Sequence, residues 1–300
     1  MIFLTVFVDL IGFGIVIPVL PYYARSFGAD AFVLGWLLAS FSIMQFLFTP
    51  YLGRLSDRIG RKPVLALSMF GTAVASVLTG MAHFVIGLPL LFAARILDGI
   101  TGANIAAAQA YIADVTPPEK RAHGMGIIGM AFGLGFVLGP AIGGELSHRF
   151  GVSVPFFVVG ALALLNALAM WLWLPEPERH VIATPSSRFQ PLLDALGRRE
   201  TALPVLVYFL ATFAFANMEA TLALLALDRF GFNTEQVGFL FGYLGILFAL
   251  VQGGLIRRLV PRFGEPRLVA VGALSAAAAL LIIGRSETLV FLLTGLGLLA

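Results

Sequence analysis

The chain has 300 residues, of which 59% are hydrophobic and only 12% are charged, and its mean hydropathy is +0.97. Soluble chains carry about 25% charged residues, so this composition excludes a soluble globular protein and indicates a polytopic membrane protein. The absence of cysteine excludes disulfides and cysteine-ligated metal sites, and we assign the net charge of +3 to cytoplasmic loops rather than to nucleic-acid binding.

Long apolar segments follow one another along the whole chain. A spanning helix needs about 20 mostly apolar residues, whereas barrel strands are about 10 residues long and alternate in polarity. Helical segments are predicted at 2–24, 32–52, 64–82, 88–113, 122–146, 154–174, 203–227, 236–256 and 267–284, and a tenth begins near 288. The first segment has no basic region or cleavage site before it, so we expect a retained helix. The predicted fold class is therefore an all-α polytopic membrane protein.

Basic residues are unevenly distributed among the loops between these segments. The loops after the second, fourth, sixth and eighth segments are rich in Lys and Arg: Arg54, Arg58, Arg61, Lys62, Lys120, Arg121, Arg179, Arg188, Arg198, Arg199, Arg257, Arg258, Arg262 and Arg267. The alternate loops contain one arginine each, at positions 25, 149, 229 and 285. Because basic loops stay in the cytoplasm, this pattern predicts a cytoplasmic N-terminus.

The longest connection, residues 175–202, divides the chain after six predicted helices. It is rich in Pro, Ser and charge, which is typical of a linker. We therefore predict an N-terminal half at 1–174 and a C-terminal half at 203–300. A pattern L-x-x-R-x-G occurs after the second helix of each half, at 55–60 and 259–264. This repeat indicates two related halves.

Four motifs carry a resemblance to a known family. They are "GRLSDRIGRK" at 53–62, "RILDGITGA" at 95–103, "GFVLGPAIGG" at 135–144 and "DLIGFGIVIPVLP" at 9–21. The chain resembles the major facilitator superfamily, and within it the drug:proton antiporters, including the tetracycline-efflux type. The resemblance implies two six-helix halves, alternating access to a midplane site, a proton gradient as energy source, and no cofactor. Since only about nine and a half helices are present, we expect a C-terminally truncated piece.

The charged stretch 53–63 has two interpretations. Its basic residues suit a membrane surface and serve as a topology anchor. A carboxylate among them, Asp57, needs cationic partners if it is buried. The resemblance implies that Asp57, Arg58 and Arg61 form a cytoplasmic latch between the two halves, and Asp114, at the end of the fourth segment, is a candidate partner for one of these arginines.

Small residues recur along the fifth segment. Gly135, Gly139 and Gly143 are spaced by four, which places them on one helix face and allows close helix packing. Pro140 favours a kink, and Gly144 completes the motif. The simple interpretation is helix packing. The resemblance implies in addition that this seam lies between the halves and limits ion leak.

Charges inside the apolar segments are the sharpest candidates for function, because each costs at least about 2.5–3.5 kcal/mol in a membrane. Asp9 lies in the first segment. Arg95 and Asp98 are three residues apart in the fourth, so they can pair on one helix face, and Gln109 continues that face. The resemblance implies a role for Arg95 in proton coupling, and the alternative for each residue is a purely structural pair.

Glu219 is the ionisable residue inside the predicted spans of the C-terminal half. A carboxyl there suits a proton carrier or a contact with a cationic substrate, and the alternative is a structural hydrogen bond. Gln252 is a weaker polar candidate. The third segment has no acid, unlike that of tetracycline exporters, which makes tetracycline itself a less expected substrate.

The sequence contains no nucleotide-binding loop and no cluster of metal ligands, so ATP-driven transport and metal chemistry are not expected. We predict a monomeric, proton-coupled antiporter of the cell inner membrane that exports small amphipathic compounds and is not an enzyme. Its expected partners are a small-molecule substrate, protons and the bilayer, without nucleic acid. The alternatives are a metabolite or sugar carrier of the same fold and a non-transporting membrane sensor or assembly protein.

Overall fold

The computed structural model describes residues 2–102, 104–117, 121–177, 197–251 and 255–300, and these residues are almost entirely helical. The helices are α1 (Ile2–Ser26), α2 (Ala31–Ile59), α3 (Arg61–Met81), α4 (Leu88–Thr101), α5 (Asn104–Val115), α6 (Arg121–Phe150), α7 (Val154–Trp173), α9 (Arg199–Phe230), α10 (Thr234–Leu250), α11 (Ile256–Phe263), α12 (Glu265–Gly284) and α13 (Leu289–Leu299). Seven of the described helices are long and apolar enough to cross a membrane. The predicted all-α membrane fold is confirmed.

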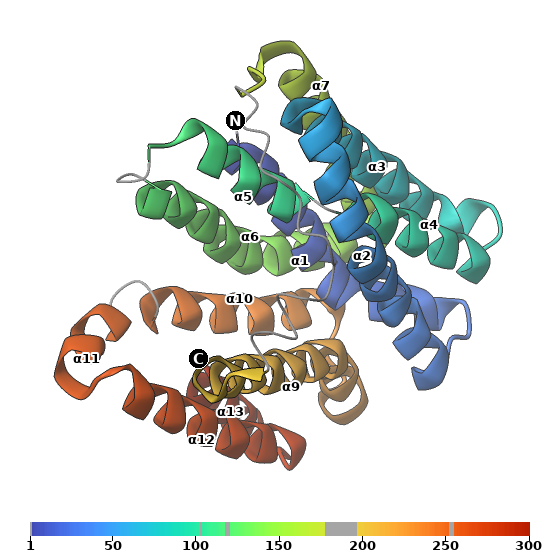
Figure 1. Cartoon of the computed structure of the whole chain (residues 1–300). Coiled ribbons are helices and arrows are strands. Elements are labelled where there is room, and N and C mark those ends of the chain that lie inside the picture. Colours follow the sequence, from blue (N-terminus) through green and yellow to red (C-terminus); the bar gives the residue numbers. More distant parts are fainter. Residues whose placement is uncertain (1, 103, 118–120, 178–196, 252–254) are drawn as a thin grey trace.

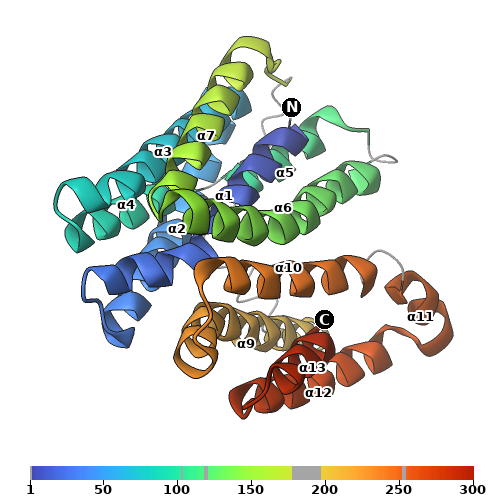
Figure 2. The ribbon, with the colours of Figure 1, turned by 180° about the vertical axis from the view of Figure 1, so that it is seen from behind.

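The helices gather into two groups (Figures 1 and 2). Helices α1–α7 pack together in one group, and α9–α13 lie side by side in the other. The two groups meet chiefly where α6 lies along α10, with α1 also touching α9 and α10. This arrangement is compatible with the predicted division at 175–202. The division itself stays a prediction, because 178–196 lie outside the described residues.

Helix α1 is the central element of the first group. It packs against α5, α6 and α7, and its Val6, Ile15 and Leu20 are fully buried. Its Ile17 belongs to the apolar core of the second group, which also contains Met218 of α9. Helix α1 therefore carries its one carboxyl, Asp9, into the interior of the protein.

The charged stretch 53–63 is almost wholly helical and not a loop. Helix α2 continues to Ile59, and α3 begins at Arg61, so Gly60 alone separates them. Gly60 has φ +113°, a conformation that residues with a side chain rarely adopt. The expected boundaries at 52 and 64 are therefore corrected, because the polar ends of both helices extend beyond the apolar spans that hydropathy detects.

The fourth predicted span, 88–113, is also corrected, because it consists of two helices. Helix α4 ends at Thr101 and α5 begins at Asn104. Between them, Gly102 has φ −75° and ψ 38°, outside helical geometry. The end of the eighth predicted span stays a prediction: α10 ends at Leu250, a residue in π-helical geometry follows at Val251, and 252–254 lie outside the described residues.

Candidate functional site

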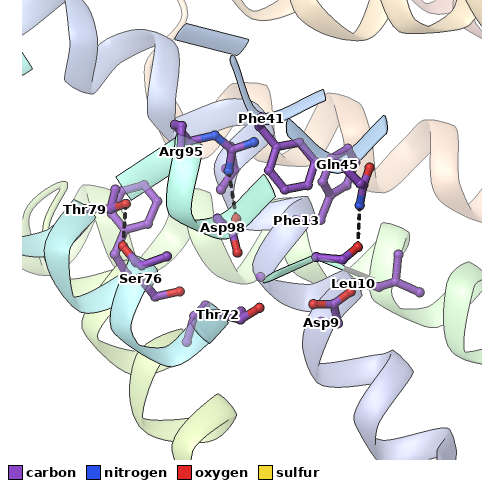
Figure 3. A pocket seen from close by; sticks show the side chains of 16 residues that line it. Asp9, Leu10, Phe13, Phe41, Gln45, Thr72, Ser76, Thr79, Arg95 and Asp98 are labelled. Atoms are coloured by element: carbon purple, nitrogen blue, oxygen red, sulfur yellow. Dashed lines mark hydrogen bonds and ion pairs between the residues drawn. The ribbon is translucent and has the colours of Figure 1, made fainter. Parts of the chain in front are cut away.

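A cavity of about 180 Å³ lies inside the first helix group, between α1, α2, α3, α4 and α7. Its polar lining is Asp9, Gln45, Thr72, Ser76, Thr79, Arg95 and Asp98. Figure 3 shows Asp9 and Asp98 directed towards the same space from α1 and α4. The structure thus brings together three of the charged residues that the sequence singled out.

Arg95 and Asp98 form the predicted pair on one face of α4. Arg95 Nη1 lies 3.2 Å from Asp98 Oδ2, and Arg95 is 4% exposed. The Arg95 guanidinium also lies over the Phe41 ring of α2, 4.2 Å from its centroid. Its Nε has no hydrogen-bond partner among the described residues. The guanidinium is thus held by one carboxylate and one ring, with donor capacity left over.

A second cavity, of about 150 Å³, lies on the other side of Arg95, where α1 and α2 face α9. Arg95, Phe41, Phe13 and Val16 line both cavities, so they form the wall between them. Glu219 lines the second cavity from α9, and its Oε1 is covered without a hydrogen-bond partner among the described residues. The wall at Arg95 therefore separates an acidic pair, Asp9 and Asp98, from a single acid of the second group.

Two other predicted polar residues are not part of this arrangement. Gln109 lies on α5, is exposed, and lines neither cavity. The prediction for Gln109 assumed one continuous helix. Because the helix breaks at Gly102, the face of α4 that carries Arg95 and Asp98 does not continue along α5. Gln252 lies outside the described residues.

At the junction of α2 and α3, Arg61 is held between two carboxylates. Its Nε lies 2.9 Å from Asp114 Oδ2 of α5, and its Nη1 lies 2.7 Å from Asp57 Oδ1 of α2. The expected pairing of Asp114 with one of the motif arginines is therefore present. Arg58 is exposed and makes no ion pair with a described residue. All these contacts join helices of the first group, and the latch between halves stays a prediction.

Sequence reasoning missed Glu176, which follows the sixth predicted span. Its Oε1 accepts a hydrogen bond from the Arg61 backbone N–H at 2.6 Å, and its Oε2 accepts one from Lys62 N–H at 3.0 Å. A carboxylate at a helix N-terminus satisfies unpaired N–H groups and complements the helix dipole. The signal in the sequence was a glutamate between two prolines, at 175–177, directly after an apolar span.

The small residues of α6 face two different helices. A Cβ on Gly139 would lie 2.9 Å from Gly14 Cα, and Gly135 and Gly143 meet α1 in the same way. Gly144 instead faces α10, where a Cβ would lie 2.5 Å from Thr234 O. The Pro140 carbonyl also faces α10, 2.5 Å from where a Cβ on Gly238 would stand. Close packing is thus realised on both sides of α6, and only the α10 side joins the two groups.

Polar contacts that were not predicted also join the two groups at one end of the molecule. Arg25 at the end of α1 makes two hydrogen bonds to Asp228 of α9, at 2.7 and 3.1 Å. The Tyr22 hydroxyl donates to the Phe232 carbonyl at 2.6 Å. Nearby on α6 and α10, His148 Nε2 lies 3.5 Å from Glu235 Oε2. All three pairs join residues that lie far apart in the chain, so local sequence patterns cannot connect them.

The sequence profile of the Major Facilitator Superfamily matches residues 2–300. The chain belongs to this superfamily. It is 33% identical over 278 residues to the class B tetracycline resistance protein of Escherichia coli, covering 90% of this chain and 68% of that protein. It is 29% identical over 280 residues to multidrug resistance protein 2 of Bacillus subtilis, covering 91% and 69%.

Solved structures agree with this assignment. The human organic anion transporter MFSD10 superimposes with a TM-score of 0.69 at 28% identity, covering 99% of this chain and 80% of that one. A bacterial homologue of the human lysosomal transporter Spinster, in an inward-facing and unoccupied conformation, gives a TM-score of 0.71 at 20% identity, covering 99% and 70%, which shows the shared fold. The protein is therefore a polytopic membrane transporter of this superfamily and not an enzyme.

Proposed function

We propose that this transporter is a proton-coupled antiporter that exports small amphipathic organic compounds by alternating access. The observation that carries the proposal is the wall at Arg95, which has Asp9 and Asp98 on one side and Glu219 on the other. The tetracycline and multidrug resistance relatives support export as the direction of transport. The cavity wall also supplies apolar surface through Phe13 and Phe41.

The balance of charge around this wall favours exchange of protons for cations. Asp9, Asp98 and Glu219 face the two cavities, and the one guanidinium there, that of Arg95, pairs with Asp98. Each uncompensated charge inside the bilayer costs at least about 2.5–3.5 kcal/mol. Glu219, whose Oε1 has no hydrogen-bond partner among the described residues, is therefore stable when it is protonated or when a cationic compound lies beside it. A proton and a cationic substrate then compete for this acid, and that competition couples their movements in opposite directions.

The contacts between the helix groups support alternating access in the cell inner membrane. In the predicted orientation, with the N-terminus in the cytoplasm, the Arg25–Asp228 pair and the Tyr22–Phe232 hydrogen bond lie at the non-cytoplasmic ends of the helices. The Arg61 cluster lies at the cytoplasmic side and joins helices of one group only. We infer a state closed at the non-cytoplasmic side, in which the cavity beside Glu219 is reached from the cytoplasm.

Everted membrane vesicles containing the protein test this function. Respiration acidifies the vesicle lumen, and addition of a lipophilic organic monocation should then release luminal protons, measured with a pH-sensitive dye. Glu219→Gln, which keeps the shape of the side chain and removes its charge, should abolish this release while the lumen still acidifies. If the wild-type protein releases no protons for any amphipathic cation, the antiport proposal is wrong.

An organic anion is the second candidate substrate. The solved relative MFSD10 is described as an organic anion transporter, and Arg95 has donor capacity that Asp98 does not use. An anion would pair with Arg95 rather than with Glu219. In the same vesicles, a dye-monitored response to anionic compounds that survives Glu219→Gln but not Arg95→Gln would favour this candidate.

A further inference from the structure

The break between α4 and α5 lies in the wall of the first cavity. A helix that ends inside the bilayer leaves its last carbonyl groups to be satisfied by other parts of the protein, because lipid offers no donors. Here the Gly102 carbonyl accepts a hydrogen bond from Gln45 Nε2 of α2 at 2.8 Å (Figure 3). Both residues line the cavity that holds Arg95 and Asp98.

Helix α2 holds α4 at three successive points along one seam. The Phe41 ring lies 4.2 Å from the Arg95 guanidinium. At Gly99 the helices are so close that a Cβ would lie 2.8 Å from Met44 Cβ. Gln45, one turn after Phe41, then binds Gly102, which lies about two turns after Arg95. The seam therefore has a cation–ring contact at one end and an amide–carbonyl hydrogen bond at the other.

We propose that Gln45 is a positioning residue for the coupling pair Arg95–Asp98. By holding the Gly102 carbonyl, its amide fixes the end of α4 and so fixes where Asp98, one turn earlier, stands in the cavity. Gly102 leaves little freedom at this point, since a Cβ there would lie 2.8 Å from the Asp98 carbonyl and 3.2 Å from Gln45 Nε2. Gln45 itself exchanges no proton. The inference rests on the proposed function, because it concerns the geometry of the coupling site.

The chemistry of the contact separates positioning from packing. The Gly102 carbonyl can only accept, so residue 45 must donate. Glutamine donates at every pH. Leucine, of similar size, never donates, and glutamate donates only while its carboxyl is protonated. If residue 45 only filled space, these three side chains would give one pH profile of transport.

The experiment compares the wild type with Gln45→Leu and Gln45→Glu. It measures substrate-driven proton release in everted vesicles between about pH 6 and pH 8.5. We expect Gln45→Leu to lower the exchange rate about tenfold at all pH values, as for loss of one hydrogen bond to a half-buried carbonyl. Gln45→Glu should approach the wild-type rate at the acidic end and fall to the leucine rate at the alkaline end. The matched control is Ser40→Ala, more than one turn before Gln45 on α2, whose hydroxyl donates to the Leu37 carbonyl of its own helix and whose loss should leave the profile unchanged.

The outcomes separate the inference from the function on which it rests. A wild-type protein without proton release would overturn the antiport proposal, whatever the variants do. A wild-type protein with proton release, and a Gln45→Leu variant of wild-type rate and pH profile, would overturn the role of Gln45. If the Gln45→Leu protein is absent from the membrane, the test depends on Gln45→Glu alone. Its exchange rate, relative to that of the wild type in the same vesicles, must fall with rising pH. A Gln45→Glu profile parallel to that of the wild type contradicts the inference.

Discussion

At the scale of single residues, the few charged side chains inside the apolar helices are the main candidates for function in this transporter. Hydropathy and spacing were sufficient to select Asp9, Arg95, Asp98 and Glu219, because a charge in an apolar span is rare and costly. The structure places all four beside two adjoining cavities. Gln45 escaped notice because a neutral amide in an apolar span gives a weak signal, and its importance depends on a break in another helix.

The Arg95–Asp98 pair should stabilise the fold as well as serve coupling. Asp98→Asn leaves a 4%-exposed guanidinium without its anion, and breaking a buried pair costs about 3–5 kcal/mol. We expect a clear fall in the thermal unfolding midpoint of the detergent-solubilised protein. The double variant Arg95→Gln/Asp98→Asn should recover most of that loss, because no charge is left unpaired. It should still fail to release protons. Equal midpoints for the single and double variants would contradict a stabilising pair.

At the scale of helices, the sequence predicted which segments are helical better than where they end. Apolar spans are visible because the bilayer demands about 20 apolar residues. The junction at Gly60 and the break at Gly102 are not visible in this way. They depend on groups that arrive from distant parts of the chain, namely Glu176 at the start of α3 and Gln45 beside α4. Local patterns cannot register partners that are 115 and 57 residues away.

The cap on α3 makes a testable difference to stability. Glu176→Gln removes the charge that faces the N-terminus of α3 and should lower stability by about 0.5–1 kcal/mol. Gly60→Ala should cost more, at least about 1–2 kcal/mol, because φ is +113° and the new Cβ would lie 2.6 Å from Glu176 Oε1. Thermal unfolding of the solubilised protein measures both. The control is Glu287→Gln, an exposed glutamate in the turn between α12 and α13, which should leave the midpoint unchanged.

At the scale of the whole molecule, the two helix groups are joined by packing far more than by charge. The α6–α10 contact brings Gly144 and Gly238 together with almost no side chain between the backbones. The Arg25–Asp228 pair joins α1 to α9 instead, and its side chains are 33% and 56% exposed. Exposed ion pairs contribute only about 0–1 kcal/mol. The pair therefore biases the closed state weakly, whereas separation of the packed helices dominates the energy of opening.

This difference in magnitude predicts opposite results from two changes at the same place. Arg25→Ala should alter the transport rate by no more than about fivefold, since the lost pair is worth about 1 kcal/mol or less.

Tethering the same two positions should abolish transport, because alternating access requires α1 and α9 to separate there. The chain contains no cysteine, so Arg25→Cys/Asp228→Cys can be joined by a short, reducible bifunctional thiol reagent without removing other thiols. Transport in vesicles should stop on cross-linking and return on reduction, while either single cysteine variant treated with the reagent should remain active. Full activity of the cross-linked protein would mean that these ends do not move apart during the cycle, and the alternating-access proposal for this face would be wrong.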